Sequence, residues 1–238
     1  MKKTILTLAV FLFVSSVSFI QAQNVKEILD NHFKAIGQDK LAKVETYAIK
    51  AKVTQMGMEL PMVMKMKKPN KFRMEMDMAG QKMIQVYDGQ KGWVVAPWIS
   101  SEPQELTGAE LEQAMAQADI DGELYNYEKK GHQVELVGKE DIDGTDMYNL
   151  KVTNKNGSVK NYYIDAEKYL INQVKASAVS MGQEVNVTQK MVEYKDFDGI
   201  KIATKIISET PMGNAEIVME EVELDAKIDD SIFAKPSN

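Results

Sequence analysis

Apolar and polar residues alternate with a period of two along most of this chain after residue 43, and this pattern limits the fold more than any other feature. At residues 47–53 a tyrosine, an isoleucine, an alanine and a valine alternate with an alanine and two lysines. The alternation returns at residues 148–152, 170–176 and 185–191. Successive side chains of a strand point to opposite faces, so these segments are predicted to be antiparallel strands with one buried and one exposed face.

Short turn signals separate the alternating segments. They are Asp88-Gly89, Asp143-Gly144, Asn156-Gly157, Asp198-Gly199 and Gly213-Asn214. Such pairs favour tight hairpins, and the segments between them predict eleven or twelve strands. A flat sheet of this size with one apolar face could not be covered by a few short helices. We therefore expect a mainly β, α+β fold in which the sheet curls into a barrel or half-barrel around two or three helices.

Three segments break the period of two and have features of helices instead. Asn24 can cap a first helix that ends at Gly37, and the residues of its apolar stripe are Val25, Ile28, Leu29, Phe33 and Ile36. Residues 107–110 have the form of a capping box, and the apolar positions that follow are Leu111, Ala114, Met115 and Ala118. A further short helix is expected from Gly122 to Lys130. These helices can cover the apolar face of the sheet.

The N-terminus has the three parts of a secretory signal peptide. Lys2 and Lys3 precede an apolar run from Ile5 to Val14, and small and polar residues follow up to Ala22. We therefore expect residues 1–22 to be removed, which leaves a single domain at residues 23–238. The chain contains no cysteine, so it has neither disulfides nor a lipid-anchoring cysteine after the leader. These features predict a soluble periplasmic protein.

Several classes of function lack support in the sequence. The net charge is −6 and the charges are scattered, so nucleic acid is not expected as a partner. His32 and His132 lie 100 residues apart, and His32 falls on the apolar stripe of the first helix. No Ser-His-Asp arrangement or metal-ligand spacing is present, and residues 141–146 are typical of a hairpin turn rather than a calcium loop. We predict no enzymatic activity, no metal and no cofactor.

The segment MVMKMKKPNKFRMEMDM, residues 62–78, holds six of the sixteen methionines. One strand face carries Met62, Met64 and Met66, and one face of the returning strand carries Met74, Met76 and Met78. If both rows face inward, the sequence numbers of two residues that lie opposite each other must add up to an even number, as for Met66 opposite Met74 or Phe72. This parity predicts an odd-numbered loop or a bulge at Lys68 to Asn70.

Two interpretations of these methionines stay open. Alternating apolar residues in a strand most often fill an ordinary core. However, β-branched and aromatic residues suit strands better than methionine does. Because methionine is unbranched and polarizable, it suits a cavity that reshapes around variable apolar cargo.

Other residues are candidates for the same cavity. Leu111 and Met115 are assigned to a lid helix, with ordinary contacts between helix and sheet as the alternative. Trp93 is a candidate for the cavity wall and Trp98 for its rim, although tryptophan in a sheet more often only packs. Arg73 is expected on the outer face in a surface ion pair with neighbouring acidic residues.

The stretch MKMKKPNKFRMEM followed by QVYDGQKGWVVAP resembles the paired motifs of the LolA-type periplasmic lipoprotein carriers. These motifs are a basic residue before Pro-Asn, an aromatic after it, then Asp-Gly and a tryptophan that leads to proline. The helix NHFKAIGQDKLAKVET and the ending IDDSIFAKPSN are also similar to this superfamily, which includes LolB and the sensor domain of RseB. The resemblance spans most of residues 23–238.

The resemblance implies a half-open barrel of about eleven antiparallel strands over a helical lid, with an apolar cavity for acyl chains. The cavity residues would be Met62, Met64, Met66, Phe72, Met74, Met76, Met78, Trp93, Leu111 and Met115. LolA has a functional arginine before Pro-Asn, and Lys68 holds that position here. Lysine keeps the charge but loses the planar fork that binds two acceptors at once.

Two hypotheses about function follow. In the first, the protein is a monomeric carrier that holds lipoprotein acyl chains or another lipid for sorting to the outer membrane. Its protein partners would be an inner-membrane donor and an outer-membrane acceptor. In the alternative, the same sheet serves as an envelope sensor or protein-interaction module without a transport role. An enzyme on this fold would need a polar constellation in the cavity, and the sequence offers none.

Overall fold

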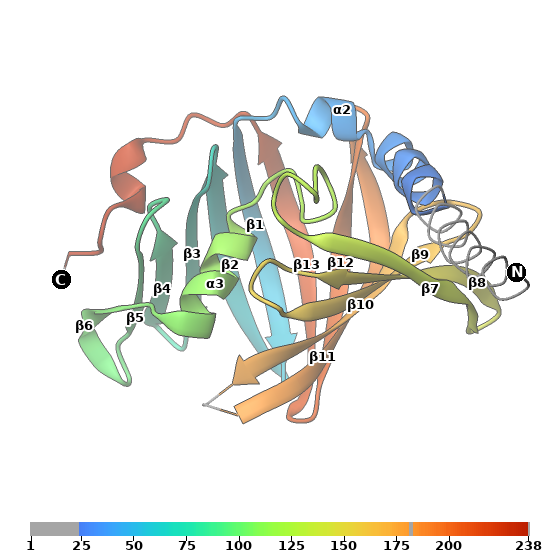
Figure 1. Cartoon of the computed structure of the whole chain (residues 1–238). Helices are drawn as coiled ribbons and strands as arrows, with labels where there is room; N and C mark the ends of the chain where they lie inside the picture. The colour runs from blue at the N-terminus through green and yellow to red at the C-terminus, as the bar shows by residue number, and fades with distance from the viewer. Residues whose placement is uncertain (1–23, 181–182, 238) are drawn as a thin grey trace, which may run out of the picture.

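The structure is a computed structural model that describes residues 24–180 and 183–237, and its main element is one antiparallel sheet of 13 strands (Figure 1). The strand order across the sheet is β6-β5-β4-β3-β2-β1-β13-β12-β11-β10-β9-β8-β7. The bounds are β1 Thr46–Gln55, β2 Met58–Lys67, β3 Lys71–Met78, β4 Gln81–Tyr87, β5 Gly92–Ala96, β6 Ser100–Glu105, β7 Gln133–Ile142, β8 Thr145–Thr153, β9 Val159–Asp165, β10 Ile171–Ser180, β11 Gln183–Phe197, β12 Ile200–Thr210 and β13 Gly213–Leu224. The antiparallel prediction is confirmed.

The predicted number of strands, eleven or twelve, is lower than the 13 observed. The short strand β6 reads SSEPQE, which has no alternation of apolar and polar residues, and it contains Pro103. A proline removes one ladder hydrogen bond and is tolerated at the edge of a sheet. The edge position of β6 therefore explains why a segment without a strand pattern forms a strand.

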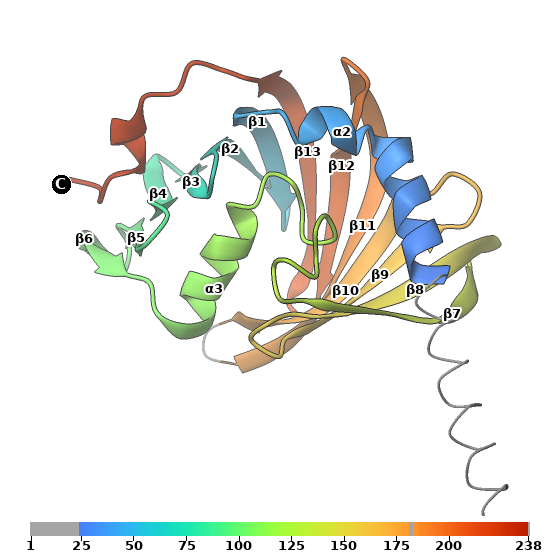
Figure 2. The same cartoon turned by 45° about the horizontal axis from the view of Figure 1, so that its top comes forward.

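The sheet curls into a half-barrel whose concave side holds helices and a loop (Figure 2). The first helix, residues 24–36, packs against β8 and β9, where Val25, Ile28 and Leu29 form one cluster with Leu150 and Ile164. Helix α2 (Gln38–Leu41) follows, and α3 (Gly108–Gln117) contacts β3 and β4. The expected half-barrel over a helical cover is confirmed.

Gly37 ends the first helix, as predicted, and its backbone is left-handed with a φ of 75°. A Cβ atom at this position would lie 2.0 Å from the carbonyl oxygen of Gly199, in the turn between β11 and β12. Only glycine permits this approach of two backbones. Asn24, however, lies within the helix rather than at its cap.

The prediction of a short helix from Gly122 to Lys130 is wrong. Residues 119–131, called here the plug loop, fold as a series of turns on the concave side of the sheet. Both Gly122 and Asn126 have left-handed backbones, and a right-handed helix cannot continue through such residues. Helix α3 begins after Thr107 as predicted, but the Thr107 side chain makes no capping hydrogen bond.

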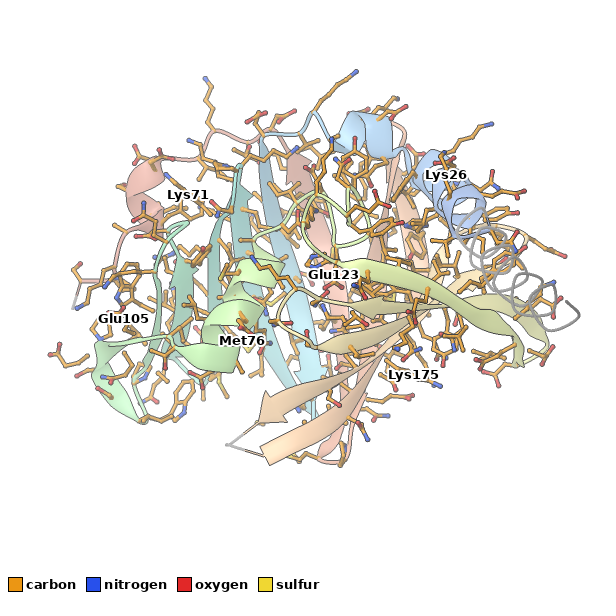
Figure 3. The ribbon with its side chains drawn as sticks, in the orientation of Figure 1. Lys26, Lys71, Met76, Glu105, Glu123 and Lys175 are labelled. Atoms are coloured by element: carbon orange, nitrogen blue, oxygen red, sulfur yellow. The ribbon has the colours of Figure 1, made fainter. Side chains whose placement is uncertain are left out.

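The C-terminal segment crosses the convex face of the sheet. It includes the short 3-10 helix η1 (Asp230–Phe233), and Phe233 is buried against Val86 and Trp93. Figure 3 labels Lys71 next to this segment, where its ammonium lies 3.2 Å from Asp230.

The predicted signal peptide at residues 1–22 lies outside the described residues. In the described part of the chain, no helix is both long and apolar enough to span a membrane.

Candidate functional site

The methionine-rich strands β2 and β3 pair in the register that parity predicted. Met62 faces Met76, Met64 faces Met74, and Met66 faces Phe72. The connection is the three-residue loop Lys68-Pro69-Asn70, whose odd length keeps both methionine rows on one side. We call the inward set Met62, Met64, Met66, Met74, Met76 and Met78 the methionine face.

Helix α3 packs on the part of the methionine face around Met66 and Phe72. Met66 and Phe72 belong to one apolar cluster with Ala114 and Ala118, both fully buried at α3 and its C-terminal end. Leu111 and Met115 of the same helix pack against this cluster. The predicted lid residues therefore contact the predicted cavity residues. The small alanines on this side of the helix allow it to approach the sheet closely.

The remaining part of the methionine face belongs to a second cluster. Met62 is buried there, whereas Met76 and Met78 are only half-buried, and they pack near Ile217 and Met219 of β13. Met64 and Met74 contact both clusters. Figure 3 labels Met76 within the curve of the sheet. The apolar face thus continues from under α3 towards the turns of the opposite end.

Tyr47 of β1 lies between the two clusters, and its hydroxyl is an exception to their apolar character. The ring packs against both clusters, and burial raises the pKa of this phenol. Its oxygen is buried without a hydrogen-bond partner among the described residues. An unpaired buried hydroxyl costs free energy, so it is a candidate to bind a polar atom of a ligand. The alternating pattern placed Tyr47 inside but did not identify this role.

Three acidic residues of the plug loop form ion pairs with lysines. Asp119 pairs with Lys130 at 2.5 Å, Asp121 with Lys68 at 2.8 Å, and Glu123 with Lys160 at 3.1 Å. We call these three pairs the plug-loop clamp. The clamp was not predicted, although the spacing of two residues between the acids was a signal for it in the sequence.

Glu123 is the most buried of the three acids, near the centre of the concave side in Figure 3. It also accepts a hydrogen bond from the Tyr162 hydroxyl. Burial would raise the pKa of Glu123, but the charge of Lys160 and the hydrogen bonds from Tyr162 and Lys160 outweigh burial and lower it. Glu123 is therefore ionised at neutral pH, and the clamp holds a charged pair inside the half-barrel.

Lys68, the residue before Pro-Asn, contacts the plug loop. Besides its ion pair with Asp121, its ammonium donates a hydrogen bond to the Ala42 carbonyl at 2.6 Å. The side chain of Gln38 also donates to the Asp121 carbonyl. Lys68 therefore connects the β2–β3 loop to the plug loop and to the chain between α2 and β1.

The two tryptophans do not join the methionine face. Trp93 faces Val86 on the convex side and is covered by Phe233. A strand reverses sides at every residue, so its neighbour Gly92 faces inward instead, next to Leu106 and Leu111. Trp98 is half-exposed at the turn between β5 and β6. The expectation that Trp93 lines the cavity is thus not supported by its position.

Arg73 makes the expected ion pair. Its guanidinium lies 2.8 Å from the Glu75 carboxylate, and it also donates to the Ile232 carbonyl at 2.9 Å. Lys82 pairs with the other oxygen of Glu75 at 2.9 Å. Arg73 therefore fixes the C-terminal segment on the convex face and does not reach the methionine face.

Both histidines have structural surroundings. His32 is buried, and its Nδ1 atom lies 2.8 Å from the Tyr169 carbonyl. Burial lowers the pKa of His32, although the hydrogen bond to Tyr169 opposes this shift. His132 Nδ1 accepts a 3.3 Å hydrogen bond from the Lys155 amide. Within residues 24–180 and 183–237, no group of three or more potential ligands could hold a metal ion.

A separate pocket of about 200 Å³ lies between the first helix and β7–β8. Its lining residues are Asn24, Glu27, Ile28, Leu136, Tyr148 and Tyr169. The rings of Tyr148 and Tyr169 stack there with their centroids 6.2 Å apart. The methionine face is not part of this pocket, so the pocket adds no support to the predicted cavity.

A protein-family model whose description reads "-like: Uncharacterized protein" matches residues 65–237. The chain belongs to this family. No curated protein sequence matches the chain at a significant level. The family match begins within β2 and includes the loop at Lys68, α3 and the plug loop.

Comparison with solved structures identifies the fold. A LolA superfamily protein from Nitrosomonas europaea has 18% identity and a TM-score of 0.59, over 90% of this chain and 98% of that chain. A domain assigned to outer membrane lipoprotein-sorting proteins from Vibrio parahaemolyticus has 12% identity and a TM-score of 0.57, over 85% and 96%. A DUF1329 family protein from Desulfovibrio piger has 17% identity and a TM-score of 0.57, over 87% and 97%. The chain therefore has the LolA-like fold.

Proposed function

We propose that this protein binds the acyl chains of lipoproteins or of another lipid on its methionine face and carries them between membranes without covalent chemistry. The observation that carries the proposal is the continuous inward row of six methionines on β2 and β3, half of it under α3. The expected setting is the periplasm, where the chain from residue 23 would act as one soluble domain. The LolA-like fold is in keeping with this role.

The free energy of such binding is sufficient. Each methylene group moved from water into an apolar site gains about 0.8 kcal/mol, so one long acyl chain gains on the order of 10 kcal/mol before ordering costs. Methionine side chains bend at three bonds and adapt to chains of different length. A face of this kind favours broad specificity over a single tight fit.

Release requires a competitor for the cargo, and α3 with the plug loop is our candidate. Leu111 and Met115 occupy the space over Met66 and Phe72 that an acyl chain would take. The plug loop is held to the rest of the protein by the pairs Asp121–Lys68 and Glu123–Lys160, and by Ile120 and Leu124, which are buried in the apolar clusters under α3 and under the first helix. Its displacement would exchange these pairs for contacts with water at little cost, and the acyl chain would take the place of Ile120 and Leu124 in the apolar clusters.

The Tyr47 hydroxyl extends the proposal to the polar part of the cargo. Because it is buried and unpaired among the described residues, an ester or amide carbonyl next to an acyl chain would supply the missing acceptor. The proposed ligand is thus an acyl group with its carbonyl, which lipoproteins and phospholipids share.

Two measurements test the proposal. Native mass spectrometry of gently purified protein should show bound lipid, and the free protein should bind a fluorescent fatty acid. The double variant Met64→Gln/Met74→Gln should weaken fatty-acid binding at least about tenfold, because polar groups then line the centre of the face. The matched control is Val63→Gln, which faces Glu75 on the other side of the same strands. Equal affinities in both variants would refute the assignment.

A further inference from the structure

Four turns at one end of the half-barrel consist of uncharged residues, and three of them carry large exposed apolar side chains. They connect β1–β2, β3–β4, β5–β6 and β12–β13, and they comprise residues 56–57, 79–80, 97–99 and 211–212. We call them the apolar turns, and they lie along the lower edge of the sheet in Figure 1. Their exposed apolar residues are Met56, Trp98, Ile99 and Met212, next to exposed Met58.

The composition of these turns differs from that of the turns at the other end. None of the nine residues in the apolar turns is charged. By contrast, each of the loops at residues 68–70, 88–91, 143–144 and 198–199 contains a charged residue. Turns normally favour polar side chains because they are surrounded by water. The absence of charge is therefore a distinctive property of the apolar turns.

The backbone conformation at Met56 is a second indication that this residue was not selected for the turn alone. Met56-Gly57 has left-handed backbones at both residues, with φ of 50° and 77°, as do Asp143-Gly144 and Asp198-Gly199. Asparagine, aspartate and glycine are the residues that tolerate this first position. Methionine there is strained, and its side chain is 76% exposed, so it contributes little to the core. The fold alone does not explain this methionine.

The apolar turns are continuous with the methionine face. Strand β2 begins at Met58 and β3 ends at Met78, so both methionine rows run to this end of the sheet. Helix α3 covers the half of the face around Phe72. The turn between β8 and β9 closes on α3 instead, through the Asn156–Glu112 hydrogen bond. The apolar turns thus flank the less covered part of the face.

We propose that the apolar turns insert into the surface of a lipid bilayer, so that acyl chains pass directly between the membrane and the methionine face. The proposal rests on the proposed function and adds the partner. Tryptophan favours the membrane–water interface, and Trp98 lies at a turn tip beside Ile99, which is 80% exposed. Side chains on separate turns enter a fluid bilayer readily, whereas a protein partner would need a matching pocket for each one.

The charges near the apolar turns indicate which type of lipid headgroup the protein would bind. Residues that flank the turns carry both signs, as Asp77 and Lys82 do, and the whole chain has a net charge of −6. Attraction to anionic lipid is therefore not the source of binding. Binding should occur on zwitterionic vesicles and should change little with salt, because insertion of apolar side chains drives it.

The test uses the chain without residues 1–22, since the predicted leader would itself bind lipid. Phosphatidylcholine vesicles should carry the protein upward in a flotation gradient at both low and high salt. Vesicles of brominated phosphatidylcholine should quench the emission of Trp98, while Trp93 under Phe233 supplies a constant background. The double variant Ile99→Ser/Met212→Ser should bind vesicles about tenfold more weakly.

The matched control is Val137→Ser/Val192→Ser, which removes two exposed apolar residues from β7 and β11 and should leave vesicle binding unchanged. Three results would overturn the proposal: no flotation on phosphatidylcholine, equal loss in both double variants, or a concentration-dependent dimer that Ile99→Ser/Met212→Ser abolishes. Fatty-acid binding in solution is measured in parallel. Vesicle binding without fatty-acid binding would reject the carrier function but support membrane insertion of the apolar turns. Fatty-acid binding without vesicle binding would reject only the membrane insertion.

Discussion

The ammonium of Lys68 and the carboxylate of Asp121 lie 2.8 Å apart, which joins the loop before β3 to the plug loop. Lys68 is the residue that precedes Pro-Asn in the LolA-like motif. The Lys68 side chain thus connects the loop between β2 and β3 to the plug loop inside the half-barrel.

We expect Lys68→Met to loosen the plug loop, because the variant loses both the ion pair and the hydrogen bond to Ala42. The free energy of unfolding should fall by about 1–2 kcal/mol, and amide hydrogens of residues 119–131 should exchange faster. Lys68→Arg should retain most of the stability. The control is Lys139→Met, which breaks the exposed pair with Asp146 and should change stability by less than about 1 kcal/mol. Unchanged exchange in Lys68→Met would contradict the clamp.

Tyr47→Phe should have opposite effects on stability and on ligand binding. Loss of the unpaired buried hydroxyl should leave the free protein equally stable, or more stable by about 1 kcal/mol. Affinity for an acyl ester should fall several-fold, whereas affinity for an alkane of the same length should stay the same. Denaturant titration and competition with a fluorescent fatty acid measure the two quantities. A destabilised variant would indicate that the hydroxyl has a protein partner.

Gly37→Ala should be among the most damaging single substitutions. Its Cβ would lie 2.0 Å from the Gly199 carbonyl, on a left-handed backbone. We expect a loss of more than about 3 kcal/mol in the free energy of unfolding. Gly57 has a φ of 77° but no atom within 4 Å of its Cβ position, so Gly57→Ala carries only the backbone strain of about 1 kcal/mol. Urea denaturation of the two variants separates crowding from strain.

The buried His32 predicts a loss of stability in acid. Its pKa is lowered in the folded protein by burial, so protonation is easier in the unfolded chain. Its contribution is complete above the unfolded pKa of about 6.5 and declines as the pH falls towards the folded pKa; each pH unit between these two pKa values is worth about 1.4 kcal/mol. The urea midpoint should decrease less between pH 8 and pH 5.5 in His32→Asn than in the parent protein. His132→Asn, at a more exposed site, should keep most of the dependence.

Local patterns were sufficient to predict most of the half-barrel. The alternation around Ile49 and the parity across Lys68 to Asn70 depend only on neighbouring residues, and both match the observed register. Strand β6 was not predictable in this way, because its edge position, not its composition, makes it a strand. The helix at residues 122–130 failed because Asn126 adopts a left-handed backbone that helical spacing does not reveal.

The candidate site was predictable only in part. Strand alternation placed the methionines on one face, but the side on which Trp93 lies depends on its register with Val86 in β4. Two of the three plug-loop acids pair with lysines from segments far away in the sequence, such as Lys160 for Glu123. Such pairs arise from tertiary structure, so the regular spacing of the acids does not identify their partners. The unpaired Tyr47 hydroxyl is likewise a property of the folded interior.

Strands β6 and β7 form the two ends of the sheet and do not pair with each other. In a closed barrel, strand number and stagger fix the diameter. Here the curvature of the sheet can change while every ladder of hydrogen bonds between neighbouring strands stays intact. The volume that the half-barrel encloses can therefore change by bending of the sheet, without loss of hydrogen bonds between neighbouring strands.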